Sequence, residues 1–356
     1  MAAPKRTRAP LSGTGGLATV RSIAKAAGVS IGSVSSVLNN RHVERRISAA
    51  TVQKIREASA RLGYLPNISA RRLRSGTSTK NHVVLALVTS FEAPIPLINH
   101  FISALRGAIA EERTARSNLD FSMMIEMYVA GRLCDLPGLL TGDHFNAAII
   151  MNTIADDDQF LTRAHLPYPV VLVNRSVPGF SSVMEDEGSG LRAAETLFRG
   201  KCRKMAVLHG RPLTQTTQVR VDRFIRRATE LAGRAPLEIV ANKLSELSGY
   251  EAMKSLLKNT TAVDGLYTVS DALALGAYRA IKERGLTIPG DIAVVGTGDY
   301  EIAPFFDPPL SSVGVSHQEL ARHASNLLLR QLGRGAKTGE TIVVPVVSVL
   351  RASSGS

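Results

Sequence analysis

Cysteine is scarce in this sequence, and long hydrophobic runs are missing from it. The two cysteines, Cys134 and Cys202, are too few for a disulfide framework, which indicates a protein of the reducing cytoplasm. They are also too few for a four-ligand zinc site, and no histidine stands at a close spacing to them, so we expect no metal. No stretch approaches the ~20 apolar residues that span a bilayer. No apolar segment follows the basic N-terminus, so we expect neither a secretory signal nor a membrane partner.

Acidic side chains are almost missing from the first 80 residues. This segment holds 15 lysines and arginines but only two acids, Glu44 and Glu57, whereas the other 276 residues hold 28 side chains of each sign. The whole net charge of +13 therefore lies in the first fifth of the chain. A compact basic segment beside a neutral body indicates a separate domain that binds a polyanion. Nucleic acid is favoured over an anionic membrane surface, because the segment lacks a long amphipathic helix with one basic face.

The length and composition suit a folded protein of two or three domains, since 44% of the 356 residues are hydrophobic and 21% are charged. We expect residues 1–18, rich in Pro, Gly and Arg, to form a disordered basic arm. Residues 19–63 are predicted to form a three-helix domain. Residues 64–80 are predicted to form a short basic helix and a linker, and residues 81–352 a larger body.

The pattern of the three-helix segment is that of a helix-turn-helix. Two helices that cross steeply need a small residue where they touch, a residue that tolerates positive φ in the turn, and an apolar anchor on the second helix. Ala24, Gly28 and Val34 supply these three, and Val52 and Ile55 with Leu62 would close the core. Each helix is preceded by a residue able to cap it: Thr19, Ser30 and Ser48. An ordinary helical hairpin is the alternative interpretation.

From residue 82 onward, apolar β-branched runs alternate with amphipathic segments. Continuous apolar strands separated by helices indicate an α/β fold with parallel sheets covered on both faces. Two doubly wound lobes suit the spacing better than one closed barrel, although periodicity alone leaves the barrel open. The predicted strands are Val83–Val88, Phe121–Ile125, Ala147–Met151, Val170–Val173, Met205–Leu208, Ile239–Ala241, Gly265–Val269 and Ile292–Val295.

Several segments together resemble the lactose-repressor (LacI/GalR) family of bacterial transcription regulators. They are the runs 18–39, 48–77, 170–175, 269–276 and 292–296, so the resemblance extends over nearly the whole chain. It implies an N-terminal helix-turn-helix domain and a hinge helix, followed by a two-lobed body like that of periplasmic sugar-binding proteins. It also implies a homodimer on a pseudo-palindromic double-stranded DNA operator, with a small-molecule effector between the lobes.

The resemblance assigns the DNA contacts to the recognition helix, its neighbours and the hinge. The residues are Thr19, Ser30, Ile31, Gly32, Ser33, Ser36, Asn39, Arg41, Asn67, Arg71, Leu73 and Arg74. At the usual base-reading positions stand Ile31, Gly32 and Ser36, which offer few hydrogen bonds to base edges, so the operator core should differ from the family's usual one. The connection from Asn39 to Ser48 is longer than is typical. Its arginines would bind phosphates, with solvated charge as the alternative.

The hinge segment places Leu73 among the arginines at 71, 72 and 74. In minor-groove binders a leucine wedge unstacks a base step while flanking arginines bind the narrowed groove. In the family the matching leucine intercalates at the operator centre. A charged linker with an incidental leucine is the alternative.

In the body, the resemblance implies an effector site formed by Arg220, Ser270, Asp271, Asp299 and Asp186, the last with its register uncertain by two residues. Leu244 stands where the family often has an aromatic ring against a sugar, which weakens the case for a sugar. A phosphorylated, acidic or more apolar effector, or a pocket that binds nothing, remains an alternative. The acidic run 156–158 is interpreted as the start of a helix rather than a cation site.

The sequence lacks the motifs of catalysis. It has no Gly-x-Ser-x-Gly, no complete phosphate loop, no Gly-x-Gly-x-x-Gly after a strand and no His-Glu-x-x-His. We therefore expect no enzyme and no cofactor, but a cytoplasmic, homodimeric, DNA-binding transcription regulator, more specifically a repressor, whose effector is a sugar, a sugar derivative or another small molecule. The alternative is an α/β enzyme or sugar-carrier body joined to a DNA-binding domain.

Overall fold

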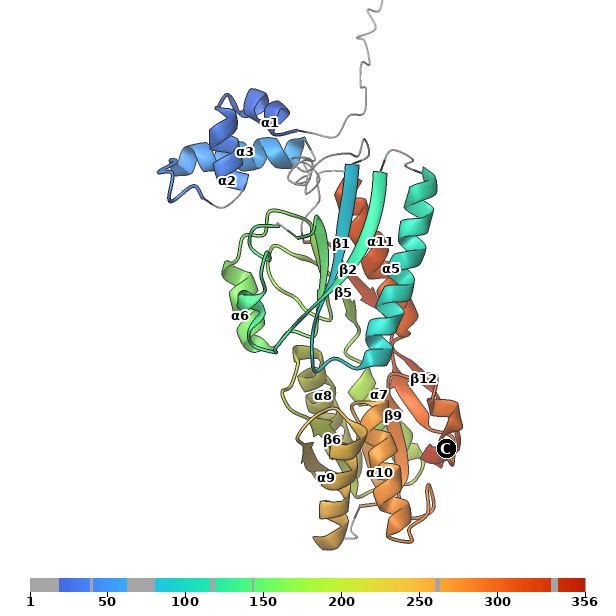
Figure 1. Cartoon of the computed structure of the whole chain (residues 1–356). Helices are drawn as coiled ribbons and strands as arrows, with labels where there is room; N and C mark the ends of the chain where they lie inside the picture. The colour runs from blue at the N-terminus through green and yellow to red at the C-terminus, as the bar shows by residue number, and fades with distance from the viewer. Residues whose placement is uncertain are drawn as a thin grey trace, which may run out of the picture. The chain divides into compact units, whose positions relative to one another are not determined.

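The computed structural model describes residues 19–38, 41–62, 81–115, 119–142, 144–259, 263–333 and 339–355 (Figure 1). The chain forms two compact units, residues 1–65 with 333–335 and residues 66–332 with 336–356, here named the N-terminal unit and the body. The predicted arm, hinge helix and linker lie outside the described residues. So do five predicted DNA contacts: Asn39, Asn67, Arg71, Leu73 and Arg74.

The N-terminal unit contains three helices, α1 (Val20–Ala27), α2 (Ile31–Leu38) and α3 (Ala49–Arg61). The three predicted caps are confirmed, because the hydroxyls of Thr19, Ser30 and Ser48 accept from backbone N–H groups three residues on, at 3.0–3.3 Å. Gly28 ends α1 with a φ of 65°, as a tight turn between crossing helices requires.

The core of this unit is small and continuous. Ile23, Val34 and Ile55 are fully buried at its centre, one from each helix. The expectation for Leu62 was wrong, since its side chain is 38% exposed. The physical reason is that Leu62 is the C-cap of α3, so it lies at the end of the helix, beyond Val52 and Ile55, which pack in the core.

The body contains two lobes, each built on one six-stranded sheet, and we call them the first lobe and the second lobe after their order in the chain. The first lobe has the strand order β11-β5-β4-β3-β1-β2, and the second lobe has the order β12-β10-β9-β8-β6-β7. Neighbouring strands are parallel except β10 and β12, which are antiparallel. The prediction of two doubly wound lobes is therefore confirmed.

The strands of the body are β1 (Asn81–Ser90), β2 (Leu119–Tyr128), β3 (Ala147–Met151), β4 (Val170–Val173), β5 (Ser181–Glu185), β6 (Met205–Gly210), β7 (Leu237–Ala241), β8 (Gly265–Thr268), β9 (Ala293–Thr297), β10 (Ser311–Gly314), β11 (Thr341–Val344) and β12 (Val347–Val349). Its helices are α5 (Ile95–Ala115), α6 (Ala155–Arg163), α7 (Ser189–Arg199), α8 (Gln215–Ala232), α9 (Glu246–Asn259), α10 (Asp271–Glu283) and α11 (His317–Gly333), with short 3₁₀ turns η2 (Leu133–Asp135), η3 (Ala303–Phe305) and η4 (Ala352–Ser354).

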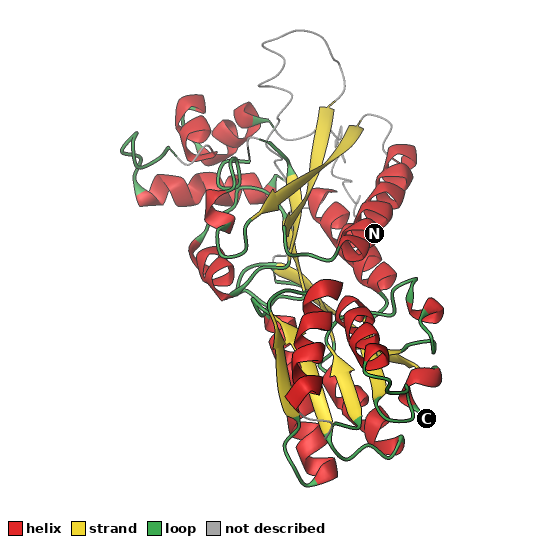
Figure 2. Ribbon diagram, turned by 60° about the horizontal axis from the view of Figure 1, so that its bottom comes forward, coloured by secondary structure: helices red, strands yellow, loops and turns green. Residues whose placement is uncertain are grey.

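Helices cover both faces of the second sheet, as Figure 2 shows. This layering is why the central strands are apolar on both sides, as in β3, whose five residues are all buried. The chain crosses between the two sheets three times, after β5, after β10 and after β11. None of the helices in the described part of the chain has the length and apolar character needed to cross a membrane.

Candidate functional site

The exposed side of α2 carries the predicted base-reading residues. Ile31 is 49% exposed and Gly32 is exposed beside it, whereas Val34 and Val37 on the opposite side are buried in the core. The Ser36 hydroxyl donates to the carbonyl oxygen of Gly32 at 2.9 Å, so it retains only its acceptor capacity for a base. The helix can therefore offer a DNA base an apolar contact and an acceptor, but few donors.

Other predicted DNA contacts surround this helix. Ser30 and Ser33 share a hydrogen bond between their hydroxyls at 2.9 Å at the start of α2, and Thr19 is exposed at the start of α1. Arg41 is exposed on the turn that joins α2 to α3, as are the arginines at 45 and 46. The turn thus presents three guanidinium groups to solvent, where they would reach phosphates of a bound duplex.

In the body, polar side chains gather where strands of both lobes end. They surround a cavity of about 80 Å³, here named the inner cavity, which Ser90, Asn152 and Asn174 line from the first lobe. Thr214, Ser270 and Thr297 line it from the second lobe, again at or after the ends of parallel strands. Ligands of open α/β sheets bind at this edge, outside the carboxyl ends of the strands.

A wider depression of about 460 Å³, the outer hollow, adjoins the inner cavity and shares five lining residues with it. These residues are Glu92, Pro94, Pro212, Leu244 and Tyr300. Leu244, which the resemblance places where the family often has an aromatic ring, therefore lies where a ligand would pass or rest. Its contact with a ligand would be apolar and without a π face.

Arg220 lines the inner cavity from α8, as expected, but its guanidinium is already paired. Nε and Nη2 donate to the two carboxylate oxygens of Glu185 at 2.7 and 2.5 Å. The side chains are only 13% and 5% exposed, and the carboxylate raises the pKa of Arg220 above its usual value. Glu185 lies at the end of β5, one residue before the predicted Asp186 and within the two-residue uncertainty of that prediction.

Helix α8 is held in place by close packing against α7. A Cβ atom at Gly190 would lie 2.1 Å from the carbonyl oxygen of Arg220, so only glycine permits this approach. The backbone of Glu185 is fixed as well, because its N–H donates to Oδ1 of Asn174 at 2.8 Å. Both members of the ion pair therefore sit on rigid backbone.

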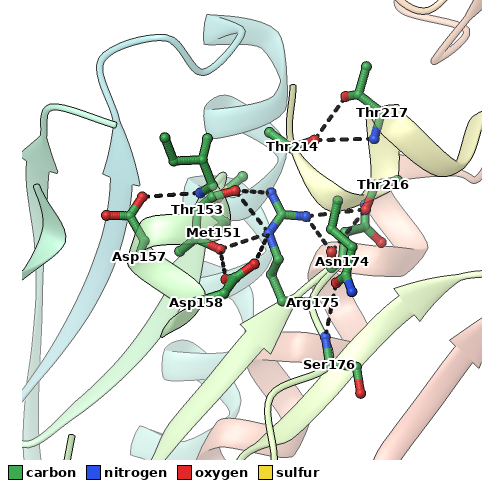
Figure 3. Close-up of polar contacts among 12 residues, drawn as sticks. Met151, Thr153, Asp157, Asp158, Asn174, Arg175, Ser176, Thr214, Thr216 and Thr217 are labelled. Carbon is green, nitrogen blue, oxygen red and sulfur yellow. Dashed lines mark hydrogen bonds and ion pairs between the residues drawn. The ribbon is translucent and has the colours of Figure 1, made fainter. Parts of the chain in front are cut away.

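Arg175 also borders the inner cavity, and its donors are directed into the protein. Figure 3 shows its guanidinium between Thr153 and Asp158 on one side and Asn174 and Thr216 on the other. Nε donates to Oγ1 of Thr153 at 2.7 Å and Nη2 to the carbonyl oxygen of Thr153 at 2.6 Å, while Nη1 donates to the carbonyl oxygen of Asn174. Because Thr216 belongs to α8 of the second lobe and accepts from Nη1 at 3.3 Å, Arg175 ties the two lobes together.

Two buried polar atoms of residues lining the inner cavity have no hydrogen-bond partner. They are Nδ2 of Asn152 and Nδ1 of His317. Asn152 follows β3 with a φ of 60°, a left-handed conformation that asparagine tolerates better than most residues. Unsatisfied buried polar groups are costly, so these two atoms mark the places where a ligand would gain hydrogen bonds.

The His317 ring stacks on Tyr300, with ring centroids 4.8 Å apart, and the ring of His100 lies 5.9 Å away. Burial, reinforced by the charge of Arg220 and by His100, lowers the pKa of His317 to about 3. The imidazole is therefore neutral at physiological pH. Neither Asn152 nor His317 was among the predicted site residues, although an asparagine directly after a buried strand was a usable signal.

The low pKa of His317 predicts a loss of stability in mild acid. Below its unfolded-state pKa of 6.5 the histidine takes up a proton only when the chain unfolds. Between pH 7 and pH 5 this should lower the free energy of unfolding by about 2 kcal/mol. The variant His317→Phe, which keeps a ring against Tyr300, should lose about 2 kcal/mol less over the same interval. Urea unfolding at both pH values measures the difference, and equal losses in the two proteins would contradict the buried neutral state.

The remaining predicted effector residues are placed differently. Ser270 lines the inner cavity, whereas Asp271 lines the outer hollow and accepts from the Tyr300 N–H and the Ser312 hydroxyl. Burial raises the pKa of Asp271 to about 7. Asp299 lies outside both spaces and pairs with Arg351 at 2.7 Å.

Asp186 is a correction to the expected set, because its carboxylate faces the protein and not the inner cavity. Oδ1 accepts from the Gly188 N–H at 2.7 Å and Oδ2 from the Val346 N–H at 2.8 Å. Asp186 thus joins two of the segments that cross between the lobes. The physical reason is the alternation of a strand, which turns Glu185 and Asp186 in opposite directions.

The acidic run 156–158 lies in the first turn of α6, as expected. Asp157 accepts from the backbone N–H groups of Gly131, Leu133 and Ile154, at 2.9–3.1 Å, so its oxygens cap backbone donors. Within the described ranges, no group of three or more His, Cys, Asp or Glu side chains is arranged to hold a metal ion.

Comparison with known proteins matches both units. Residues 19–67 match the family described as bacterial regulatory proteins of the lacI family, and residues 194–354 match the periplasmic binding protein-like domain. The HTH-type transcriptional regulator CelR of Thermobifida fusca is 28% identical over 333 residues, which are 91% of this chain and 93% of CelR.

Two solved structures resemble the fold over nearly the whole chain. A complex of the transcriptional regulator CelR with cellobiose has a TM-score of 0.66 at 25% identity and covers 94% of this chain and 99% of its own. The lac repressor dimer bound to operator and the anti-inducer ONPF has a TM-score of 0.65 at 25% identity, covering 95% and 99%.

Proposed function

The chain belongs to the lacI family of bacterial regulatory proteins, and from this premise we propose that it is a cytoplasmic, dimeric repressor released from its operator by a small molecule. It is a DNA-binding transcription regulator and not an enzyme. The observation that carries the effector proposal is that both lobes line the inner cavity. A ligand there contacts both lobes and so favours one arrangement of them over another.

The DNA part of the proposal rests on the charge of residues 1–80 and on the exposed side of α2. Phosphate contacts from arginines supply affinity, and α2 supplies an apolar contact through Ile31 and an acceptor through Ser36. With so few donors on α2, the operator's central step contributes more of the specificity, through deformation by the hinge.

The dimer is supported by an exposed apolar surface at the outer hollow. Phe91 and Ile95 of the first lobe and Ile302 of the second lobe line this hollow with exposed fractions of 62, 71 and 48%. Phe305, close behind Ile302 in the chain, is 84% exposed. Large exposed apolar side chains from both lobes are typical of a protein–protein interface, and we propose that a second copy of this chain contacts them at the rim of the hollow and leaves the way to the inner cavity open.

The effector is proposed to be a sugar, a sugar derivative or another small polar molecule. The CelR structure holds cellobiose, but Leu244 offers no ring for stacking on a sugar face in this chain. The unpartnered atoms of Asn152 and His317 are suited to hydroxyl or carbonyl oxygens of a ligand.

The proposed function is tested in two stages. Selection of bound sequences from random duplexes, followed by footprinting, should return a pseudo-palindromic site with two half-sites. Small molecules are then screened for release of the full-length protein from that site. A protein that selects no sequence, or an operator complex that no member of a broad sugar, polyol and nucleobase panel weakens, would overturn the respective half of the proposal.

The proposed wedge makes a separate prediction. Leu73→Ala should lower specific affinity by a few kcal/mol, which is about the scale of one unstacked base step, and it should reduce the bend in the operator. Non-specific affinity should change little, because phosphate contacts carry it. Gel shifts with circularly permuted sites measure the bend. An unchanged bend together with an unchanged ratio of specific to non-specific affinity would make Leu73 an incidental linker residue.

A further inference from the structure

We infer that the inner cavity selects uncharged ligands, because Glu185 occupies the guanidinium group that an anionic ligand would need. The inference rests on the proposed function in one respect, namely that the inner cavity is the effector site. It goes further in naming the charge class of the ligand and the residue that sets it.

The ion pair of Arg220 and Glu185 has the geometry that an anionic ligand would need. Nε and Nη2 of Arg220 both donate to the carboxylate of Glu185, which is the bidentate arrangement that a ligand carboxylate or phosphate would otherwise take. The third nitrogen, Nη1, is 3.4 Å from the carbonyl oxygen of Val269. An anion could gain the paired face of Arg220 only by displacing Glu185, whose side chain is 5% exposed and would be left as a buried, unpaired carboxylate.

The other residues that line the inner cavity offer no free positive charge to an anion. Among the described residues that line the inner cavity, Arg175 is the other group that is positive at neutral pH, and it donates to oxygens of Thr153, Asn174 and Thr216. His317 is uncharged there. Glu92 adds a negative charge at the entrance.

The outer hollow does not reverse this balance. It adds two cations, Arg211 and Lys243, and the two acids Glu92 and Glu246 balance them; Asp271 lines it as well, with a pKa that burial raises to about 7. A phosphorylated or carboxylated ligand therefore meets no surplus of positive charge in the outer hollow. In the inner cavity, no interaction compensates for the free-energy cost of its dehydration.

The inner cavity offers a ligand neutral hydrogen-bonding groups. Its partnerless buried atoms, Nδ2 of Asn152 and Nδ1 of His317, belong to neutral groups, and the Ser270 hydroxyl lies on the same lining. Neutral amide, imidazole and hydroxyl groups pair with hydroxyl and carbonyl oxygens without a charge to compensate. The ligand class is thus an uncharged molecule rich in hydroxyl or amide groups.

The test uses the full-length protein with inorganic phosphate as the probe and sodium chloride at matched ionic strength as the reference. Thermal unfolding of the wild type should show no stabilisation specific to phosphate. Glu185→Gln keeps the side-chain shape but frees Arg220, so it should bind phosphate at least about tenfold more tightly, the scale of one charge-assisted hydrogen bond. The matched control is Glu187→Gln, which frees the more exposed Arg223 and should behave like the wild type.

A second measurement needs no variant and stands if Glu185→Gln fails to fold. Sugars are compared with their own phosphate esters for stabilisation of the wild type, and at least one uncharged member should bind at least tenfold more tightly than its ester. Tighter binding of the esters, binding by no uncharged member, or a folded Glu185→Gln that ignores phosphate would overturn the inference. DNA enters neither measurement, so failure here is distinguishable from failure of operator control.

Discussion

A fragment that begins at residue 81 should keep the fold of the body and lose its preference for the operator, with an affinity loss of more than about 10³-fold. The fragment retains both six-stranded sheets, but it lacks α1–α3 and the whole +13 charge of the first 80 residues. What remains is neutral overall, so it cannot replace condensed counterions along the DNA. Circular dichroism checks the fold, and fluorescence anisotropy with labelled operator measures binding.

The full-length protein serves as the control in a salt titration. Its logarithmic affinity should fall with a slope of about −0.9 per phosphate contact, whereas the fragment should show no such slope because it makes no contacts of this kind. A fragment that binds operator as tightly as the full chain would place the DNA-binding surface in the body, and the assignment of residues 19–80 would then fail.

The sequence predicted the elements that have a simple periodic signal. All eight predicted strands are present. Six of them are central strands, which are apolar along their whole length in parallel sheets, whereas β2 and β7 lie at the edges. The strands β5, β10, β11 and β12 were not predicted, and the first two of them each begin with two serines. The serine side chains are nevertheless buried, and the Ser311 hydroxyl donates to the carbonyl oxygen of Arg351, a partner 40 residues away. Such long-range hydrogen bonds leave no local pattern.

The sequence predicted only those residues of the candidate site whose position follows from chain order. Arg220 and Ser270 follow strands directly or lie one turn into the next helix, so the chain order places them near the inner cavity. The choice between Glu185 and Asp186 depends on the register of β5, and one residue reverses the direction of the side chain. His317 comes from the crossing after β10, and only the folded chain brings it to the lobes' interface with Tyr300.

Arg175→Ala should destabilise the body by about 3–5 kcal/mol, the range observed when one partner of a buried charged network is removed. The Arg175 side chain is 2% exposed, and its donors satisfy the carbonyl oxygens of Thr153 and Asn174 together with two threonine hydroxyls. Alanine would remove the donors to the buried carbonyl oxygen of Thr153 and leave a void where a large side chain stood, whereas the carbonyl oxygen of Asn174 would still accept from the Thr216 hydroxyl at 2.9 Å. At about 2–4 °C per kcal/mol, the melting temperature should fall by about 6–20 °C.

Lysine should rescue little of this loss. Its single ammonium group cannot span acceptors on the loops after β3 and β4 and on α8, whereas the planar guanidinium reaches all three at once. The control is Arg279→Ala, which removes an exposed pair with Glu283 and should leave the melting temperature unchanged. If Arg175→Ala melted together with this control, the guanidinium would be held for a ligand and not for the fold. Arg175 would then join Arg220 among the groups whose charge decides what the inner cavity accepts.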